Sequence, residues 1–341
     1  MKGAQIILDH LNGREAAAHL VDGKLQDILV DTDAPRPGTI YRATADRPVK
    51  GQGGMFLKTP DGPAFLRQVK GLAPGQTILV QVTGFAEEGK AIPVTQKVLF
   101  KSRYAIVTPD APGRNISRSI RDEDVRDTLL GIVHEVMDED DNMGLILRSS
   151  CATAEAGEVA EDIDAMLTLA RQVSAETEGS VETLVEGDAP HAEAWREWTD
   201  PAEIVTAAGS FETHGVLDAV EDLNDISVSL GGGASLFIEP TRALVAVDVN
   251  TGRDTSPAAG LKANMATARE LPRQLSLRGL GGQITLDLAP MPKKDRRAFE
   301  SALRSAFRAD TIDTTLVGWT PLGHYELQRK RARLPLSEVL K

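Results

Sequence analysis

Two carboxylates each close an apolar stretch in the last third of the chain. Asp248 follows the run 244–247, and Asp287 follows the run 283–286. An acid that ends an otherwise apolar strand costs desolvation free energy unless it is paired or bound to a cation. Strands joined by a helix tend to lie side by side and parallel, so both carboxylates can reach one edge of one sheet. With the amide of Asn250 they form an oxygen-rich site suited to Mg²⁺, which keeps several waters for a substrate phosphate.

The alternative for each acid is a capping role, in which it accepts hydrogen bonds from the helix or turn that follows. Basic residues crowd the same part of the sequence: Arg253, Lys262, Arg269, Arg273, Arg278, Lys293, Lys294, Arg296 and Arg297. A phosphate-bearing substrate beside Mg²⁺ accounts for them, and so does solvation of helix surfaces.

Motifs of other chemistries are missing: Gly279–Gly282 lacks the lysine and hydroxyl residue of a phosphate loop, and there is no Gly-x-Ser-x-Gly elbow.

The elements that must position these residues belong to a chain of 341 residues, 41% of them apolar and 26% charged. This length suits two or three domains, or one body with an inserted module. No apolar run approaches the ~18–20 residues of a membrane span, and the first residues lack a secretory pattern. The single cysteine, Cys151, excludes an intramolecular disulfide framework and a cysteine-rich zinc site. We therefore expect a cytoplasmic protein.

The net charge of −12 conceals a strong segregation. Residues 1–121 carry +6 and residues 253–341 carry +7, whereas residues 122–226 carry −24. The local field steers a polyanion more than the total charge does, so a nucleic-acid partner stays open. A solvated acidic face with scattered lysines is the alternative.

The first hundred residues predict β structure. Apolar stretches on either side of Asp22-Gly23 indicate a hairpin, and the prolines and glycine of 35–38 mark a module boundary. Short strands are expected at 38–43, 54–57, 77–85 and 91–97. About five short strands in so short a segment suit a small OB-type barrel, a common binder of single strands.

The rest of the chain predicts mixed α and β structure. We expect helices over 122–137, 155–175, 192–198, 216–223, 257–277 (kinked at Pro272) and 293–308, and strands over 102–109, 143–149, 227–230, 234–239, 244–249, 283–288 and 315–319. In the last 115 residues strands and helices alternate, which indicates an α/β layer.

Several stretches together resemble the ribonuclease E/G family, over nearly the whole chain. They are Leu244–Gly252, Ala263-Asn264, Ala268–Leu271, Arg273–Gly282 and Leu286-Asp287, and upstream Leu20–Gly23, Ile40-Tyr41, Asn115–Ile120 and Gly144–Ser149. The resemblance implies an endoribonuclease acting on single-stranded, A/U-leaning RNA in RNA processing or decay, including rRNA processing. It would leave 5′-phosphate and 3′-hydroxyl ends.

The resemblance also implies a fold of α/β and α+β subdomains. An RNase H-like part (1–35 plus 178–225), trimmed here, would be interrupted by an S1-like RNA-binding barrel (36–98) and a 5′-sensor (99–177). A DNase I-like catalytic subdomain (226–341) would follow.

The resemblance assigns roles at the catalytic end. Asp248 and Asp287 match the family's magnesium carboxylates, with Mn²⁺ as an alternative cation, and Asn250 matches its supporting amide. Such a cation would activate water and neutralise charge on the scissile phosphate. Lys90 and Arg118 match residues near the RNA path.

Two further groups are implied by the resemblance. Arg148 and Ser149, with the backbone at Ile106, match a pocket for a 5′-monophosphate, and a guanidinium fork suits a terminal phosphate. Phe56 and Phe65 match aromatics of the barrel that stack on unpaired bases.

The chain departs from the family at several positions. The cysteine pair that links family subunits through zinc is absent, so we expect no zinc and no zinc-linked dimer, and the oligomeric state stays open. Pro290 replaces a second acid, and Asp313 replaces a basic residue.

Two rivals to an endoribonuclease therefore remain. One is a catalytically weak or inactive RNA-binding relative. The other is an α/β enzyme that uses Mg²⁺ on small phosphate esters.

Overall fold

The computed structural model describes residues 3–49, 53–69, 71–109, 111–137, 142–256 and 258–341. The chain divides into two compact units. Unit 1 combines the residues up to Asp31 with Glu203–Lys341, and unit 2 comprises Thr32–Ala202. The expected helix start at Pro257 lies outside the described residues.

Unit 1 begins with an antiparallel meander, as the Asp22-Gly23 turn predicts. Its strands are β1 (Ala4–Leu11), β2 (Arg14–Val21) and β3 (Lys24–Val30), with β14 (Glu203–Val205) parallel to β1. Asp22 and Gly23 have φ values of 51° and 78°, the left-handed pair that a two-residue hairpin turn requires. The short helices α4 (Ser210–Thr213), α5 (Val216–Asp222) and α8 (Leu336–Val339) contribute to the same core.

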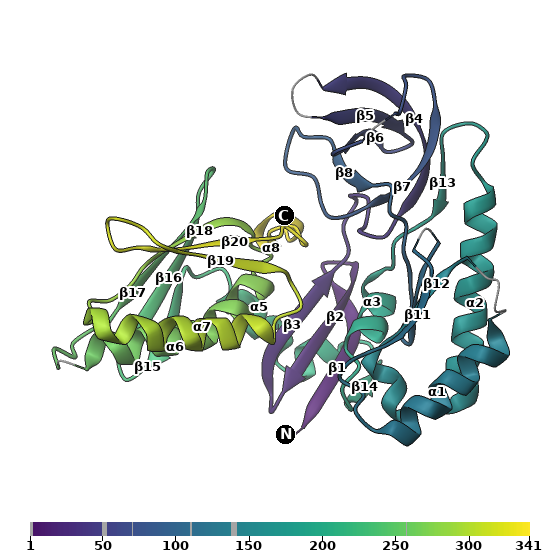
Figure 1. Cartoon of the computed structure of the whole chain (residues 1–341). Coiled ribbons are helices and arrows are strands. Elements are labelled where there is room, and N and C mark those ends of the chain that lie inside the picture. Colours follow the sequence, from purple (N-terminus) through teal and green to yellow (C-terminus); the bar gives the residue numbers. More distant parts are fainter. Residues whose placement is uncertain (1–2, 50–52, 70, 110, 138–141, 257) are drawn as a thin grey trace. The chain divides into compact units, whose positions relative to one another are not determined.

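The second sheet of unit 1 has six strands in the order β15-β16-β17-β18-β20-β19. They are β15 (Ser227–Gly231), β16 (Ala234–Pro240), β17 (Val245–Asn250), β18 (Gly282–Asp287), β19 (Thr314–Trp319) and β20 (Tyr325–Arg329). The parallel strands β17 and β18 are joined by α6 (Ala259–Leu277), and α7 (Arg296–Arg308) follows the 3-10 turn η2 (Lys293–Asp295). Figure 1 shows α6 and α7 lying together along this sheet.

One face of this sheet packs on the two helices. Val245 and Val247 of β17 are buried, together with Leu271 of α6 and Phe299 of α7. Along β17 buried and accessible side chains alternate, so the alternate residues point to the uncovered face. The alternation therefore decides where the polar residues of β17 lie.

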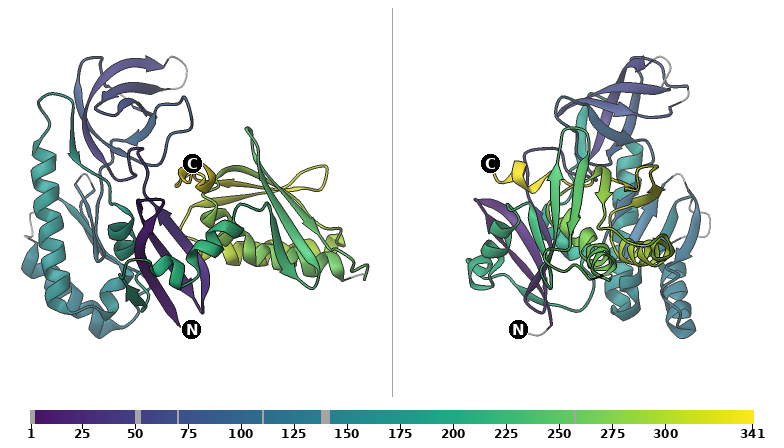
Figure 2. Two further views of the ribbon diagram at one scale, coloured as in Figure 1. Left: turned by 180° about the vertical axis from the view of Figure 1, so that it is seen from behind. Right: turned by 90° about the vertical axis from the view of Figure 1, so that its left-hand side faces the viewer.

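Unit 2 contains a closed five-stranded barrel, drawn purple to blue in Figure 2. Its strands are β4 (Ile40–Val49), β5 (Gly54–Thr59), β6 (Gly62–Leu66), β7 (Thr77–Val82) and β8 (Ile92–Thr95). The barrel closes because β4 pairs with β5 on one side and with β7 on the other. β13 (Glu182–Val185) adds to the free part of β4, so residues 178–202 lie in unit 2.

The rest of unit 2 is a small sheet with two long helices. Its strands, in the order β11-β12-β10-β9, are β9 (Phe100–Lys101), β10 (Ala105–Thr108), β11 (Gly113–Ile116) and β12 (Gly144–Leu147). The helices α1 (Glu123–Val136) and α2 (Ala156–Ala175) share its core. α1 begins as predicted, because the Asp122 carboxylate accepts from the N–H groups of Asp124 and Val125.

Some elements differ from the expectation. The strand expected from residue 102 starts only at Ala105, because Ser102 turns the chain by bonding to Ala105. β6 and β20 were not predicted. None of the helices within the described ranges combines the length and apolarity needed to cross a membrane.

Candidate functional site

Asp248 and Asp287 occupy paired positions on neighbouring strands. The parallel register of β17 and β18 sets Asp248 directly opposite Asp287, on strands that lie about 4.8 Å apart. Both side chains are exposed, whereas the residues that precede them, Val247 and Leu286, are buried toward the helices. The structure thus brings the two predicted carboxylates together on the uncovered face of the sheet.

This pair is a centre of negative charge. Two ionised groups about 5 Å apart repel by roughly 1 kcal/mol in water and roughly 3 kcal/mol at an effective dielectric constant of 20. Asn250 Nδ2 donates to Asp248 Oδ2 at 2.7 Å, and His324 Nε2 lies 3.8 Å from Asp287 Oδ1. Within the described ranges neither carboxylate forms an ion pair with a lysine or arginine. A divalent cation would remove the repulsion.

The donor set fits an ion shared between protein and substrate. In the part of the chain that the structure describes, no three His, Cys, Asp or Glu side chains converge on one point. Mg²⁺ needs only one or two carboxylates, because it retains waters and takes substrate phosphate oxygens as further ligands. Asp248 and Asp287 therefore suit Mg²⁺ without a closed protein cage.

We expected from the sequence that burial would cost these two acids desolvation free energy, and this prediction is wrong. The side chain of Asp287 is 69% exposed, because strand alternation turns it to the solvent face. Capping is not seen either: among the described residues no backbone N–H donates to Asp248 or Asp287. What the sequence predicted correctly is that the two carboxylates lie side by side.

Asn264 of α6 holds the loop that follows Asp287, and sequence reasoning gave it no role at the site. Its fully buried side chain donates to the carbonyl of Ala289 at 2.8 Å and accepts from the N–H of Ala289 at 3.0 Å. Gly260 allows the same loop to approach α6, since a Cβ at residue 260 would lie 1.9 Å from the Pro290 carbonyl oxygen. The signal available in the sequence was a polar residue, Asn264, at the helical spacing of the apolar positions of this helix.

The predicted phosphate-pocket residues lie together in unit 2. Arg148 follows β12, Ser149 begins the 3-10 turn η1 (Ser149–Thr153), and Ile106 lies in the adjacent strand β10. Ile106 is paired on its other side with Lys101 of β9. The structure therefore adds a second cation, Lys101, that sequence reasoning missed.

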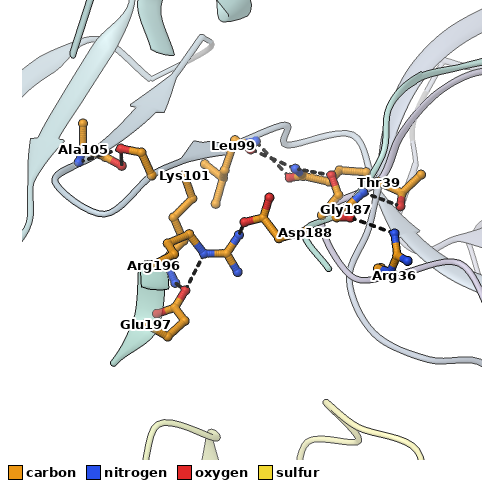
Figure 3. A network of polar contacts seen from close by, with 12 residues as sticks. Arg36, Thr39, Leu99, Lys101, Ala105, Gly187, Asp188, Arg196 and Glu197 are labelled. Carbon is orange, nitrogen blue, oxygen red and sulfur yellow. Dashed lines mark hydrogen bonds and ion pairs between the residues drawn. The ribbon is translucent and has the colours of Figure 1, made fainter. Parts of the chain in front are cut away.

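A carboxylate already contacts these cations. Glu197, the last residue of α3 (Pro190–Glu197), accepts from Arg148 Nη2 at 2.8 Å, from Lys101 Nζ at 2.6 Å and from Arg196 Nε at 2.8 Å. Arg196 also pairs with Asp188. We call Lys101, Arg148, Asp188, Arg196 and Glu197 the Glu197 cluster. Figure 3 labels Lys101, Asp188, Arg196 and Glu197.

The Glu197 cluster fixes the charge of its central acid. Burial raises the pKa of Glu197, but the hydrogen bond and charge of Lys101, with Arg196 and Arg148, outweigh burial and hold this pKa at about 2. Burial also lowers the pKa of Lys101, against the effect of Glu197. Arg148 Nη1 further donates to the carbonyls of Ser102 at 2.6 Å and Arg196 at 3.0 Å. A phosphate would have to exchange with the Glu197 carboxylate.

The predicted barrel aromatics form a pair. Phe56 of β5 and Phe65 of β6 are directly opposite, with ring centroids 5.3 Å apart. The Arg47 guanidinium lies 5.1 Å from the centroid of Phe56. Both rings are partly exposed, so the barrel presents two aromatic faces and a cation on one surface.

The remaining predicted residues lie elsewhere on the two units. Lys90 is exposed and pairs with Glu87 at 2.6 Å, and Arg118 is exposed between β11 and α1. Asp313 lies just before β19, where its carbonyl accepts from the N–H of Lys330 at 2.9 Å. Nothing in these contacts assigns a role to Lys90 or Arg118.

Comparison with known proteins places this geometry in a family context. The model of the ribonuclease E/G family matches residues 100–206 and 199–332. Ribonuclease G of Salmonella typhimurium and that of Escherichia coli K12 are each 26% identical over 408 residues, covering 99% of this chain and 82% of the relative. Ribonuclease E of Synechocystis sp. is 25% identical over 383 residues, covering 95% of this chain and 56% of the relative.

The pKa of Glu197 predicts an acid-sensitive contribution to stability. Because this pKa lies below the ordinary value of 4.5, the stabilisation is present above about pH 5 and is lost as the pH falls toward 2. The shift corresponds to about 3 kcal/mol at most, and we expect about half of that after screening by solvent. Urea unfolding of wild type and Glu197→Gln should differ most at pH 7, and the difference should shrink below pH 5 and be largely lost only near pH 2. A difference that does not change with pH contradicts the assignment.

Proposed function

The chain belongs to the ribonuclease E/G family, and on that premise we propose that it is a Mg²⁺-dependent endoribonuclease for single-stranded RNA. Its products would carry 5′-phosphate and 3′-hydroxyl ends, and its preferred sequences would be A/U-leaning. Family membership supports endoribonuclease activity in RNA processing or decay. The observation that carries the proposal for this chain is the paired placement of Asp248 and Asp287.

In this proposal the open sheet face is where the RNA backbone is cut. Asp248 and Asp287 would hold the cation between them, and Asn250 would keep the Asp248 carboxylate in position through its 2.7 Å hydrogen bond. When bound there, Mg²⁺ supplies charge neutralisation at the scissile phosphate and a water of lowered pKa. Asn264 would fix the loop after Asp287, so that the second carboxylate keeps its place.

The barrel would bind unpaired bases. Phe56 and Phe65 offer partly exposed rings next to each other, and Arg47 adds a positive charge beside them. Stacking on aromatic side chains needs a base that is not paired, and it tolerates any sequence. This arrangement supports a preference for single-stranded over double-stranded RNA.

A second binding site in unit 2 would recognise the 5′ end. Arg148, Ser149 and the strand at Ile106 supply the family-like pocket, and Lys101 adds a cation. A terminal monophosphate carries more charge than the Glu197 carboxylate that it would replace. We therefore include stimulation by a 5′-monophosphate in the proposal.

We also propose the identities of the subdomains and the location of the chain. The RNase H-like part would comprise 1–35 and 178–225, of which residues 178–202 pack in unit 2. The S1-like barrel would be 36–98, the 5′-sensor 99–177 and the DNase I-like part 226–341. We propose that the chain works in the cytoplasm.

Pro290 and Asp313 motivate a second candidate, an RNA-binding relative with weak or no cleavage. A cleavage assay separates this candidate from the first.

Loss of either carboxylate should lower the rate of cleavage strongly. With an A/U-rich single-stranded RNA carrying a 5′-hydroxyl, we expect cuts in Mg²⁺ and none in EDTA. Asp248→Asn and Asp287→Asn should each lower the rate at least about a hundredfold, since a metal ion contributes several kcal/mol to such a step. Glu239→Gln, an exposed acid on the same sheet, is the matched control. RNA binding without cleavage in wild type favours the second candidate and contradicts the first.

The 5′-phosphate site should show opposite responses to two substitutions. RNA with a 5′-monophosphate should be cut several-fold faster than the 5′-hydroxyl form. Arg148→Gln should remove that preference, because it removes the guanidinium fork. Glu197→Gln should enlarge the preference, because it removes the competing negative charge, and Arg171→Gln on α2 serves as control. Equal rates on both RNAs in wild type would rule out the site.

A further inference from the structure

A large aromatic side chain stands exposed beside the Glu197 cluster. Trp195 of α3 is 51% exposed, although large apolar rings are usually mostly buried. The guanidinium of Arg103 lies 4.0 Å from the ring centroid of Trp195, and Arg103 also donates to the Trp195 carbonyl. Arg103 thus covers one face of the ring, and the exposure of Trp195 leaves ring surface free for another group.

The turn between β9 and β10 connects this ring to the phosphate pocket. Lys101 and Arg103 come from the same four-residue segment as Tyr104. The backbone N–H of Arg148 donates to the Tyr104 carbonyl at 2.8 Å, and Ser150 Oγ donates to the Arg103 carbonyl at 2.6 Å. The cations that would hold a phosphate and the arginine under Trp195 are therefore fixed by one network.

Three consecutive residues of α3 face this network. Trp195 stacks with Arg103, the Arg196 carbonyl accepts from Arg148, and the Glu197 carboxylate bonds to Arg148 and Lys101. The aromatic ring and the anion-binding groups are thus neighbours in sequence and in contacts. All of them belong to unit 2.

Anchoring α3 does not require the Trp195 ring. The buried residues of this helix are Pro190 and Ala194, and Arg148 and Lys101 hold its last turn through Glu197. A tryptophan that served only to pack the helix would be buried, because burial of its apolar surface provides the stabilisation.

We propose that Trp195, backed by Arg103, is a stacking platform for the base of the 5′-terminal nucleotide. The phosphate of that nucleotide would bind Arg148 and Lys101 in place of the Glu197 carboxylate, so this inference rests on the proposed function. Stacking on an aromatic face is sequence-tolerant and is strengthened by a cation on the other side of the ring. The pocket would thus recognise a nucleotide 5′-phosphate rather than a bare phosphate.

Binding in EDTA, where the RNA stays intact, tests the platform. Fluorescence anisotropy would compare two 3′-labelled, 5′-phosphorylated oligonucleotides, one with a terminal adenine and one with an abasic terminal ribose. Wild type should bind the adenine form about tenfold more tightly, the effect expected for one stacked base. Trp195→Ala should remove that gap without changing the affinity for the abasic form, and Trp195→Phe should retain most of it. Leu99→Ala, another exposed apolar residue of unit 2, is the control.

Several outcomes would overturn the platform. Equal binding of the two oligonucleotides by wild type overturns it without any variant being needed. A Trp195→Ala variant that loses affinity equally for both forms shows a structural role instead. Cleavage of 5′-hydroxyl RNA in Mg²⁺ reports on the proposed function separately: cleavage with no base effect overturns the platform alone, and neither cleavage nor binding overturns both.

Discussion

The parallel register of β17 and β18 is the constraint on which the site depends. It places two like charges, Asp248 and Asp287, at paired positions, where their repulsion opposes the fold unless a cation joins them. The α6 crossover makes the strands parallel, and the packing of α6 and α7 on one face leaves the acids on the other. Asn264 and the close approach at Gly260 then hold the loop after the second acid. The fold thus creates a repulsion between two carboxylates, and binding of a divalent cation there would remove it.

In unit 2 like charges also lie close together, but there they are positive. There Lys101, Arg148 and Arg196 all contact the carboxylate of Glu197, which holds the three cations together and occupies their hydrogen-bond donors. In the proposed function, an anion with higher charge and more acceptor oxygens would replace that carboxylate at the same cations. In our proposal, the exposed ring of Trp195 would make a nucleotide bind better than a free anion. We therefore propose that unit 1 binds a cation and that unit 2 binds an anionic end group.

Much of this architecture follows from local sequence signals. The Asp22-Gly23 turn and the helix expected from residue 122 depend on short-range backbone chemistry, and both predictions were confirmed. The structure adds that the Asp122 side chain caps this helix. The pairing of the two acids could be predicted because a strand–helix–strand unit has few topologies. Their exposure could not, since it depends on which face the helices cover. Glu197 could not be assigned to Arg148 either, because 49 residues separate them and only the docking of α3 brings them together.

In our proposal, Asp248 and Asp287 act as one site for a divalent cation. Titration of the metal-free protein with Mn²⁺, followed by electron paramagnetic resonance of the free ion, measures this without any RNA. We expect one ion per chain, competition by Mg²⁺, and a loss of at least tenfold in affinity for both Asp248→Asn and Asp287→Asn, because each variant leaves a single carboxylate. An affinity for Mn²⁺ that is unchanged in either variant would contradict the account.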